Sequence, residues 1–501
     1  MRSLLAWSRI VRASRRTMAT GTKKEVIGIA QVNPNVIKAQ YAVRGPILDT
    51  VNAVEKQLQQ KDHGLSFSEV VKVNIGNPQA LKQKPITFSR QVLAACAYNE
   101  LSEKDVFPSD VVDRARMILN SCEGHSMGAY SDSKGIKVVR QHVVEFLEAR
   151  DKHPADTEKI FMSNGASEGI RMVLELIATG EGKTRSGVMI PIPQYPLYTA
   201  SLQELGMPAV PYYLDEDNGW KLDANDLYRN VKAARETCNP VMLVVINPGN
   251  PTGQILTEQN MKEIIKFCAD ENLVLLADEV YQENIYAPEK SFVSFKKALR
   301  DMGPDYENFQ LISCHSTSKG FYGECGQRGG YLEVIGFPDD VMGQLLKLAS
   351  VKLCPAVAGQ IIADTIVKPP HVGGPSRDLY FKEKAAILDS LAERAHLVSK
   401  SLNEIEGVSC NPVEGSMYAF PRITMPEKAI TAAKKVGLAP DALFCKEMVE
   451  QKGICTVPGS GFGQKEGTFH FRMTILPPLE QLQRIVVDIK DFHKEFSTRY
   501  A

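Results

Sequence analysis

The sequence has few features that would tie it to a membrane, a nucleic acid or a disulfide framework. Its 501 residues carry 59 basic and 59 acidic side chains, and a zero net charge indicates no surface for nucleic acid or anionic lipid. Apolar runs such as Val241–Ile246 and Leu273–Ala277 are much shorter than the ~18 residues of a membrane span. The ten cysteines form no CxxC pair, which argues against zinc sites and disulfides and favours a reducing compartment.

The first 24 residues contain no acidic side chain. Arginines alternate there with apolar residues, and on a helix Leu4, Trp7 and Val11 share one face. A basic amphipathic segment without acids is typical of a mitochondrial transit peptide, so we expect residues 1–24 to be a leader to the mitochondrial matrix. A disordered basic tail is the alternative. Met18 follows the arginines directly, and a second start there would give a cytoplasmic form.

The length and the order of the patterns predict an α/β fold with more than one packed unit. A single core stops growing at about 250–300 residues, which this chain exceeds. Strand-like and helix-like segments alternate over residues 120–370, as in a large domain built on a mainly parallel, doubly wound sheet. The Pro/Gly-rich stretch Lys368–Pro375 precedes a smaller α+β domain, expected over 371–501. Residues 25–119 are expected to form an N-terminal arm and part of that smaller domain.

Ranges for the main elements follow from these patterns. The strands expected in the large sheet are Lys159–Ser163, Pro240–Asn247, Leu273–Ala277, Gln310–Cys314 and Gly330–Ile335, with helices over Glu168–Ala178 and Glu258–Asp270. In the smaller domain we expect long helices from Leu379 to about Ile405 and from Leu479 to about Phe496, and a strand over Thr468–Ile475. Ligands of such sheets bind beyond the carboxyl ends of the strands, where polar residues follow several of these runs.

Lys319 follows one of these strands, in the segment Ser316-Thr317-Ser318-Lys319. Taken alone it is a surface residue, since lysine is rarely buried. Ser316 and Arg328 flank it, however, and a hydroxyl and a guanidinium are good donors to phosphate. A lysine between them could react with a phosphorylated aldehyde and form an imine.

Two further strand ends carry polar side chains. Asp278 ends the apolar run Leu275–Ala277, and Tyr281 follows three residues later. A carboxylate there could pair with the ring nitrogen of pyridoxal phosphate, or it could only cap the next helix. Asn250 lies in a tight Asn-Pro-Gly-Asn-Pro turn and could hold the ring oxygen, although a plain strand-to-helix turn is the alternative.

Three other residues complete the candidate set. At a strand–turn–helix junction, the backbone N–H groups of Ala166 and Ser167 could cradle a phosphate, although a simple helix cap is the alternative. Tyr195 could stack on a planar cofactor or be a core aromatic. Arg472, on an otherwise apolar strand, suits a substrate carboxylate, although a surface position is equally compatible with that segment.

Taken together and in this order, the residues resemble those of the fold-type I pyridoxal-phosphate enzymes, and among them the aminotransferases. The resemblance extends from about Glu25 to the C-terminus and implies the same two-domain fold. The segments Ala39–Pro46, Gly128–Ser133 and Ser313–Gly320 are similar to those of eukaryotic alanine aminotransferases. This implies transamination of L-alanine with 2-oxoglutarate to pyruvate and L-glutamate. An aminotransferase of other small or aromatic amino acids is the alternative. A transcription regulator with a similar domain is disfavoured, since about 24 preceding residues are too few for a DNA-binding module.

The resemblance also implies a role for each residue around the cofactor ring. Lys319 would hold pyridoxal phosphate as an imine and later move a proton between the substrate and the cofactor. Asp278 would pair with the ring nitrogen. Asn250 and Tyr281 would hold the ring oxygen, and Tyr195 would stack on the ring.

The remaining roles concern the phosphate, the substrate and the assembly. The resemblance assigns phosphate binding to Ala166, Ser167, Ser316 and Arg328. Arg472 would hold the substrate carboxylate, with a backbone contact from Gly76. In this family a tyrosine matching Tyr130 contacts the phosphate of the partner subunit, which implies a homodimer. No metal site, nucleic acid or membrane partner is expected.

Overall fold

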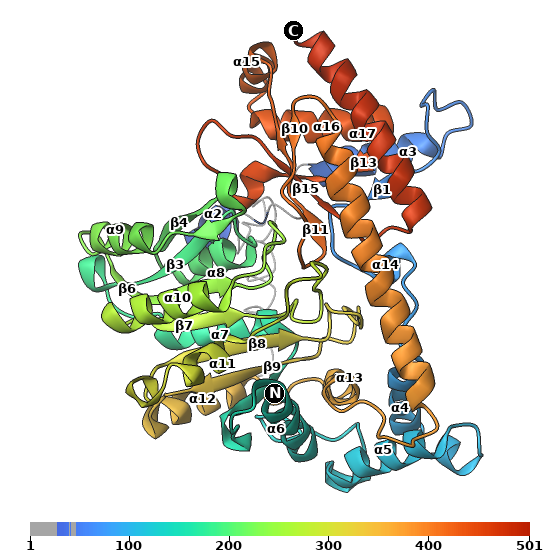
Figure 1. The fold of residues 1–501 in the computed structure, drawn as a ribbon, viewed down its shortest axis with the longest axis vertical. Coiled ribbons are helices and arrows are strands. Elements are labelled where there is room, and N and C mark those ends of the chain that lie inside the picture. The colour runs from blue at the N-terminus through green and yellow to red at the C-terminus, as the bar shows by residue number, and fades with distance from the viewer. Residues whose placement is uncertain (1–27, 40, 42–46) are drawn as a thin grey trace, which may run out of the picture.

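The computed structural model describes residues 28–39, 41 and 47–501. The predicted leader over residues 1–24 lies outside these ranges. Figure 1 shows a large sheet covered by helices on both faces, a smaller unit at one end, and the long helix α14 (Arg377–Asn403) running from that unit along the large one. Among the helices described, none is both long enough and apolar enough to cross a membrane.

The large sheet has eight strands, and its central part is parallel. In spatial order the strands are β2 (Ile160–Ser163), β9 (Gly330–Ile335), β8 (Leu311–Ser316), β7 (Val274–Asp278), β6 (Asn239–Ile246), β3 (Ser186–Ile192), β4 (Ala209–Asp215) and β5 (Lys221–Leu222). The run from β8 through β7, β6 and β3 to β4 is parallel, whereas β9 and β5 pair antiparallel with their neighbours. The predicted α/β fold with a mainly parallel sheet is therefore confirmed.

Side chains of the central strands are buried on both faces of the sheet. Along β6, Val244 and Ile246 enter one apolar cluster and Leu243 and Val245 enter another, because successive residues point to opposite faces. The first face is covered by α7 (Ala166–Ile177), α8 (Leu197–Leu205) and α12 (Asp339–Val351), and the second by α9 (Ala224–Ala234), α10 (Glu258–Asp270) and α11 (Phe295–Asp301). Burial on both faces explains why these strands read as continuous apolar runs.

Helices from distant parts of the chain pack beside the β2–β9 edge. They are α4 (Thr87–Ala97), α5 (Ser109–Asn120), α6 (Lys137–Asp151) and α13 (Val357–Val367). Their apolar cluster includes Ile160 and Met162 of β2 and Tyr331 of β9. Residues 87–120 thus pack with the large sheet, whereas α3 (Ile47–Leu58) packs on α16 (Pro440–Lys452) of the smaller unit. The domain boundaries themselves stay a prediction.

The smaller unit combines short strands with helices. Its other elements are β1 (Val71–Lys72), β10 (Val408–Ser409), β11 (Tyr418–Ala419), β12 (Arg422–Ile423), β13 (Ile454–Cys455), β14 (Val457–Pro458), β15 (Phe471–Thr474), α15 (Glu427–Lys435) and α17 (Leu479–Arg499). The short helix α2 (Pro34–Lys38) lies on α8 of the large unit instead. Strand β15 pairs with β11 and β14, with Tyr418 opposite Thr474 and Val457 opposite Arg472. This pairing turns Tyr418 and Arg472 toward the end of the large sheet.

Candidate active site

A cavity of about 300 Å³ opens beyond the carboxyl ends of β6, β7 and β8. Its lining brings together almost all of the residues expected from the sequence: Gly76, Ala166, Ser167, Tyr195, Asn250, Asp278, Tyr281, Ser316, Lys319, Arg328 and Arg472. Tyr130 is the exception, because it is 72% exposed and does not line the cavity. Parallel strands deliver these side chains to one edge, as the topology of such sheets requires.

Asp278 ends β7 and lies buried in the cavity wall. Its Oδ2 accepts a hydrogen bond from the Tyr198 hydroxyl at 2.9 Å, while its Oδ1 has no partner among the described residues. Burial raises the pKa of Asp278 to about 6, although the Tyr198 bond, the Val280 N–H and the charge of Lys319 oppose that rise. A buried carboxylate with one free oxygen is suited to a cationic ligand atom, which would supply the missing partner.

Lys319 extends from the turn after β8 toward Gly76. Its Nζ donates a hydrogen bond to the Gly76 carbonyl at 3.2 Å and lies 5.8 Å from the centre of the Tyr281 ring. The amine is thus held against the segment that precedes α4, near the Tyr281 ring. A side chain at residue 76 would collide with the Tyr418 hydroxyl and come within 3.3 Å of Lys319 Nζ, so glycine keeps this space open.

One end of the cavity is built from donors around the start of α7. Arg328 Nη2 donates to the Ser167 hydroxyl at 3.2 Å and to the Asn164 carbonyl at 2.9 Å. Gly165 precedes the helix with φ +79°, and a Cβ there would come within 2.6 Å of the Arg328 guanidinium. The first N–H groups and the positive dipole end of α7, next to a guanidinium, are chemically suited to an anionic group.

Arg472 also lines the cavity and is only 1% exposed. Nη1 donates to Asn250 Oδ1 at 3.1 Å and Nη2 donates to the Asn74 carbonyl at 2.6 Å, while Nε has no partner in the part of the chain that the structure describes. Asn250 also donates to the Tyr281 hydroxyl at 3.3 Å. No carboxylate of residues 28–39, 41 or 47–501 pairs with this buried guanidinium, so it is suited to an anionic ligand.

Comparison with known proteins agrees with this geometry. The model of the family described as aminotransferase class I and II matches residues 92–489. The chain belongs to this family. It is 52% identical to a Danio rerio protein named "Alanine aminotransferase 2-like" over 95% of this chain and 87% of that one. It is 49% identical to a Dictyostelium discoideum protein named "Probable alanine aminotransferase, mitochondrial" over 96% and 91% of the two chains.

Solved structures of aminotransferases share the fold. An alanine aminotransferase from Pyrococcus furiosus superposes with a TM-score of 0.72 at 22% identity, covering 93% of this chain and all of that one. At that identity the likeness supports the fold of this aminotransferase, which is the fold-type I arrangement expected from the sequence.

Two tyrosines of this aminotransferase line the cavity without having been expected there. Tyr418 comes from β11 of the smaller unit, and Tyr41 comes from the N-terminal segment. The Tyr41 and Tyr195 hydroxyls are hydrogen-bonded at 2.8 Å. Tyr41 falls in the segment 39–46 that resembles alanine aminotransferases, and this resemblance was the sequence feature that could have placed it in the site. For Tyr418 the local sequence offers none, because its position depends on strand pairing with β15.

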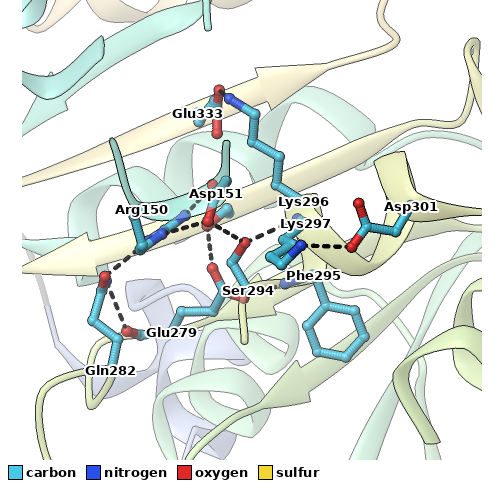
Figure 2. Close-up of polar contacts among 11 residues, drawn as sticks. Arg150, Asp151, Glu279, Gln282, Ser294, Phe295, Lys296, Lys297, Asp301 and Glu333 are labelled. Carbon is cyan, nitrogen blue, oxygen red and sulfur yellow. Dashed lines mark hydrogen bonds and ion pairs between the residues drawn. The ribbon is translucent and has the colours of Figure 1, made fainter. Parts of the chain in front are cut away.

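A buried ionic network fixes the loop that follows Asp278 (Figure 2). At the end of α6, Arg150 forms a two-point ion pair with Asp151 at 2.7 Å and donates to Gln282 at 2.8 Å. Asp151 accepts a hydrogen bond from Ser294 at 2.8 Å, and Glu279 accepts one from the Phe295 N–H at 2.7 Å. Both ends of the 279–294 loop are therefore anchored, and Tyr281 lies between the anchors.

Proposed function

We propose that this aminotransferase uses pyridoxal phosphate to exchange the amino group between L-alanine and 2-oxoglutarate, giving pyruvate and L-glutamate. The observation that supports it best is the placement of Lys319 in one cavity with Asp278 and Arg472. The choice of alanine rests on the names of relatives that are about half identical over nearly the whole chain.

The donor set matches the chemical groups of pyridoxal phosphate. Asp278 has an unpartnered buried oxygen for a protonated ring nitrogen, and a cation there would restore the ionised form that burial disfavours. Asn250 and Tyr281, already hydrogen-bonded to each other, would hold the ring oxygen. Tyr195 would stack on the ring. When bound, the cofactor supplies an aldehyde and a conjugated ring that stabilises negative charge on the substrate α-carbon.

The phosphate would lie at the start of α7. Backbone N–H groups of Ala166 and Ser167, the Ser316 hydroxyl and the Arg328 guanidinium supply neutral and cationic donors. Arg328 is already oriented by its bonds to Ser167 and Asn164, so binding costs little reorganisation.

Lys319 would act as the acid–base group. Its amine would move a proton between the substrate α-carbon and the aldehyde carbon of the cofactor, as general base and then general acid. Arg472, with the free Nε, would hold the substrate carboxylate, and the Gly76 backbone would add a contact. Two fixed anchors would orient the α-carbon proton toward the amine.

The test is a coupled assay of the purified protein with 2-oxoglutarate and a panel of amino donors. Alanine should rank among the best donors. Because one methylene in an apolar pocket is worth only about 1–3 kcal/mol, weaker activity on other small amino acids is expected. A preference for aromatic donors, with alanine poor, would retain the family and reject the substrate.

We propose that the active form is a homodimer. In the resembling family a tyrosine matching Tyr130 contacts the partner's phosphate, and Tyr130 is largely exposed in the single chain. An exposed aromatic on a loop is available for such a contact.

We also propose a mitochondrial matrix location, with a second, cytoplasmic form that starts at Met18. The support is the basic, acid-free segment 1–24 and the Dictyostelium relative named mitochondrial. Sequencing the N-termini of protein from both cell fractions tests it, and a single leader-cleaved end in both would reject the second start.

A further inference from the structure

Tyr418 occupies a position between the amine of Lys319 and the guanidinium of Arg472. It lies on β11, is buried, and lines the cavity. Its hydroxyl and Lys319 Nζ both lie next to the α-carbon of Gly76, on the side where a Cβ would project. The Tyr418 hydroxyl is therefore close to the reacting amine, although it comes from the smaller unit.

The ring of Tyr418 also fixes the plane of Arg472. The guanidinium carbon lies 4.1 Å from the centre of the Tyr418 ring and 4.6 Å from that of Phe462. A desolvated guanidinium between two aromatic rings is held by cation–π attraction as well as by packing. Its two Nη groups are engaged by Asn250 and Asn74, which leaves Nε for a ligand.

The hydroxyls of Tyr418 and Tyr281 form an unequal pair. Tyr281 donates to Tyr418 at 3.5 Å. Burial opposes ionisation of Tyr418, but the positive charges of Lys319 and Arg472 and hydrogen bonds with Tyr281 and Lys319 lower its pKa below the usual 10.0. By contrast, burial and the neighbouring Tyr418 raise the pKa of Tyr281. Tyr418 is thus the better acceptor of the two.

We propose that Tyr418 serves the reaction at two points: its hydroxyl accepts a hydrogen bond from the Lys319 amine and orients it, and its ring holds Arg472 in the orientation that receives the substrate carboxylate. The inference rests on the proposed function and adds to it a residue that couples the proton-carrying amine to the carboxylate site. Packing alone would not account for the hydroxyl, because burying it without need costs free energy that phenylalanine would avoid.

The first test is Tyr418→Phe, which keeps the ring and removes the hydroxyl. We expect kcat for alanine to fall roughly 10–100-fold, while KM changes less than about twofold, because the carboxylate site is retained. The rate at which the cofactor-free protein captures added pyridoxal phosphate, followed by visible absorbance, should fall about tenfold, because the amine is no longer oriented. Unchanged kcat and capture rate would reject the role of the hydroxyl.

The second test is Tyr418→Leu, which removes the ring as well. KM for alanine should rise about tenfold or more above that of Tyr418→Phe, because Arg472 loses one aromatic face. Equal KM in the two variants would reject the role of the ring. Tyr380→Phe is the matched control, since it removes a buried hydroxyl, bonded to the Thr365 carbonyl at 3.5 Å, outside the cavity. It should keep the wild-type capture rate and kinetic constants.

A measurement on the cofactor-free protein covers the case in which Tyr418 variants do not fold. Ultraviolet titration of tyrosinate should give less absorbance at the same pH in Lys319→Ala than in the wild type over the range where Tyr418 ionises, because the substitution removes a charge that lowers the pKa of Tyr418. No difference between the two proteins would overturn the Lys319–Tyr418 contact. The capture and titration experiments need no amino donor, so a protein that fails on alanine would reject the proposed function and still leave Tyr418 testable.

Discussion

Burial raises the pKa of both Asp278 and Tyr418, yet their net pKa shifts are opposite because their neighbours differ. Asp278 has two neutral hydrogen-bond donors, the Tyr198 hydroxyl and the Val280 N–H, and the charge of Lys319 acts least on it, so burial dominates and raises its pKa to about 6. Tyr418 lies beside both Lys319 and Arg472, whose charges outweigh burial. The cavity therefore accepts a cation at Asp278 and anionic character near Lys319 and Arg472, a polarity that fits an amino acid and a protonated ring.

Lys319→Ala should abolish the visible absorbance that comes from covalent attachment of pyridoxal phosphate and lower transamination at least about 10³-fold, because both the attachment point and the proton carrier are lost. Absorbance spectra after removal of free cofactor, together with the coupled assay, measure this. Lys384→Ala is the matched control, since that amine pairs with Glu283 at 2.8 Å and does not line the cavity. Absorbance retained by Lys319→Ala would reject the assignment.

Asp278→Asn should alter how the stability of the cofactor-free protein depends on pH. The folded-state pKa of about 6 exceeds the ordinary 3.8, so the folded protein binds the extra proton between these values and loses stability as pH rises through them. The free-energy cost of ionising the buried Asp278 is absent below pH 3.8 and complete above pH 6. At about 1.4 kcal/mol for each pKa unit, it amounts to at most about 3 kcal/mol.

Urea unfolding of the two cofactor-free proteins measures this difference. Asp278→Asn should be the more stable at pH 7, and the advantage should shrink as pH falls toward 4. The same variant should lose transamination activity, because an amide cannot keep the ring nitrogen protonated. An advantage that is independent of pH would contradict the buried carboxyl as its source.

Most individual site residues could be predicted from the sequence because each stands at a strand end or in a short, unusual motif. Asp278, Lys319 and Asn250 follow apolar strands directly, and chain topology alone brings such positions together. Tyr418 could not be found in this way, because its neighbours Lys319 and Arg472 lie on other elements. The bond between Arg472 and Asn250 joins residues 222 positions apart, which no local pattern encodes.

At the scale of elements, the network at the end of α6 ties the helix to the loop that carries Tyr281 (Figure 2). Asp151 is almost fully buried and accepts from both Arg150 and Ser294. A buried charge that loses its partner is costly, whereas an exposed pair contributes little.

Asp151→Asn should therefore destabilise the protein by up to about 3–5 kcal/mol, because Arg150, whose side chain is only 15% exposed, keeps its charge without a carboxylate. The midpoint of urea unfolding at pH 7 measures it. Lys446→Gln removes one partner of an exposed pair with Glu450 on α16 and should change stability by less than about 0.5 kcal/mol. Similar effects of the two substitutions would mean that the network contributes no more than a surface pair.

For elements with a strong hydrophobic periodicity, the first and last residues were predicted to within about two positions. Helix α10 begins and ends where expected, and β7 and β9 differ from expectation by at most one residue at either end. Strands β3 and β4 were not anticipated, because Pro191 and Pro211 interrupt runs that would otherwise read as strands. Neighbouring strands stabilise both segments in spite of these prolines, an effect that only the assembled sheet provides.

At the scale of the whole molecule, the cavity is built by segments from the full length of the chain. Gly76 precedes the large sheet, Lys319 follows β8, and Tyr418 and Arg472 come from the smaller unit. Any relative movement of the two units would change the distance between the amine and the carboxylate site. Tyr130 lies outside this cavity, so its proposed role requires a second subunit.

A subunit-mixing experiment tests the proposed homodimer. In a twofold dimer, a site that takes Lys319 from one chain would take Tyr130 from the other. Lys319→Ala and Tyr130→Ala homodimers would each have two defective sites. A hybrid would combine one doubly altered site with one wild-type site, so unfolding and refolding an equal mixture should restore about a quarter of wild-type activity. Mixing Lys319→Ala with Asp278→Asn is the control, because both residues belong to the same chain's site and no wild-type site can form. Activity that stays at the level of the unmixed variants would contradict a shared site, and a sedimentation mass of one chain would contradict the dimer itself.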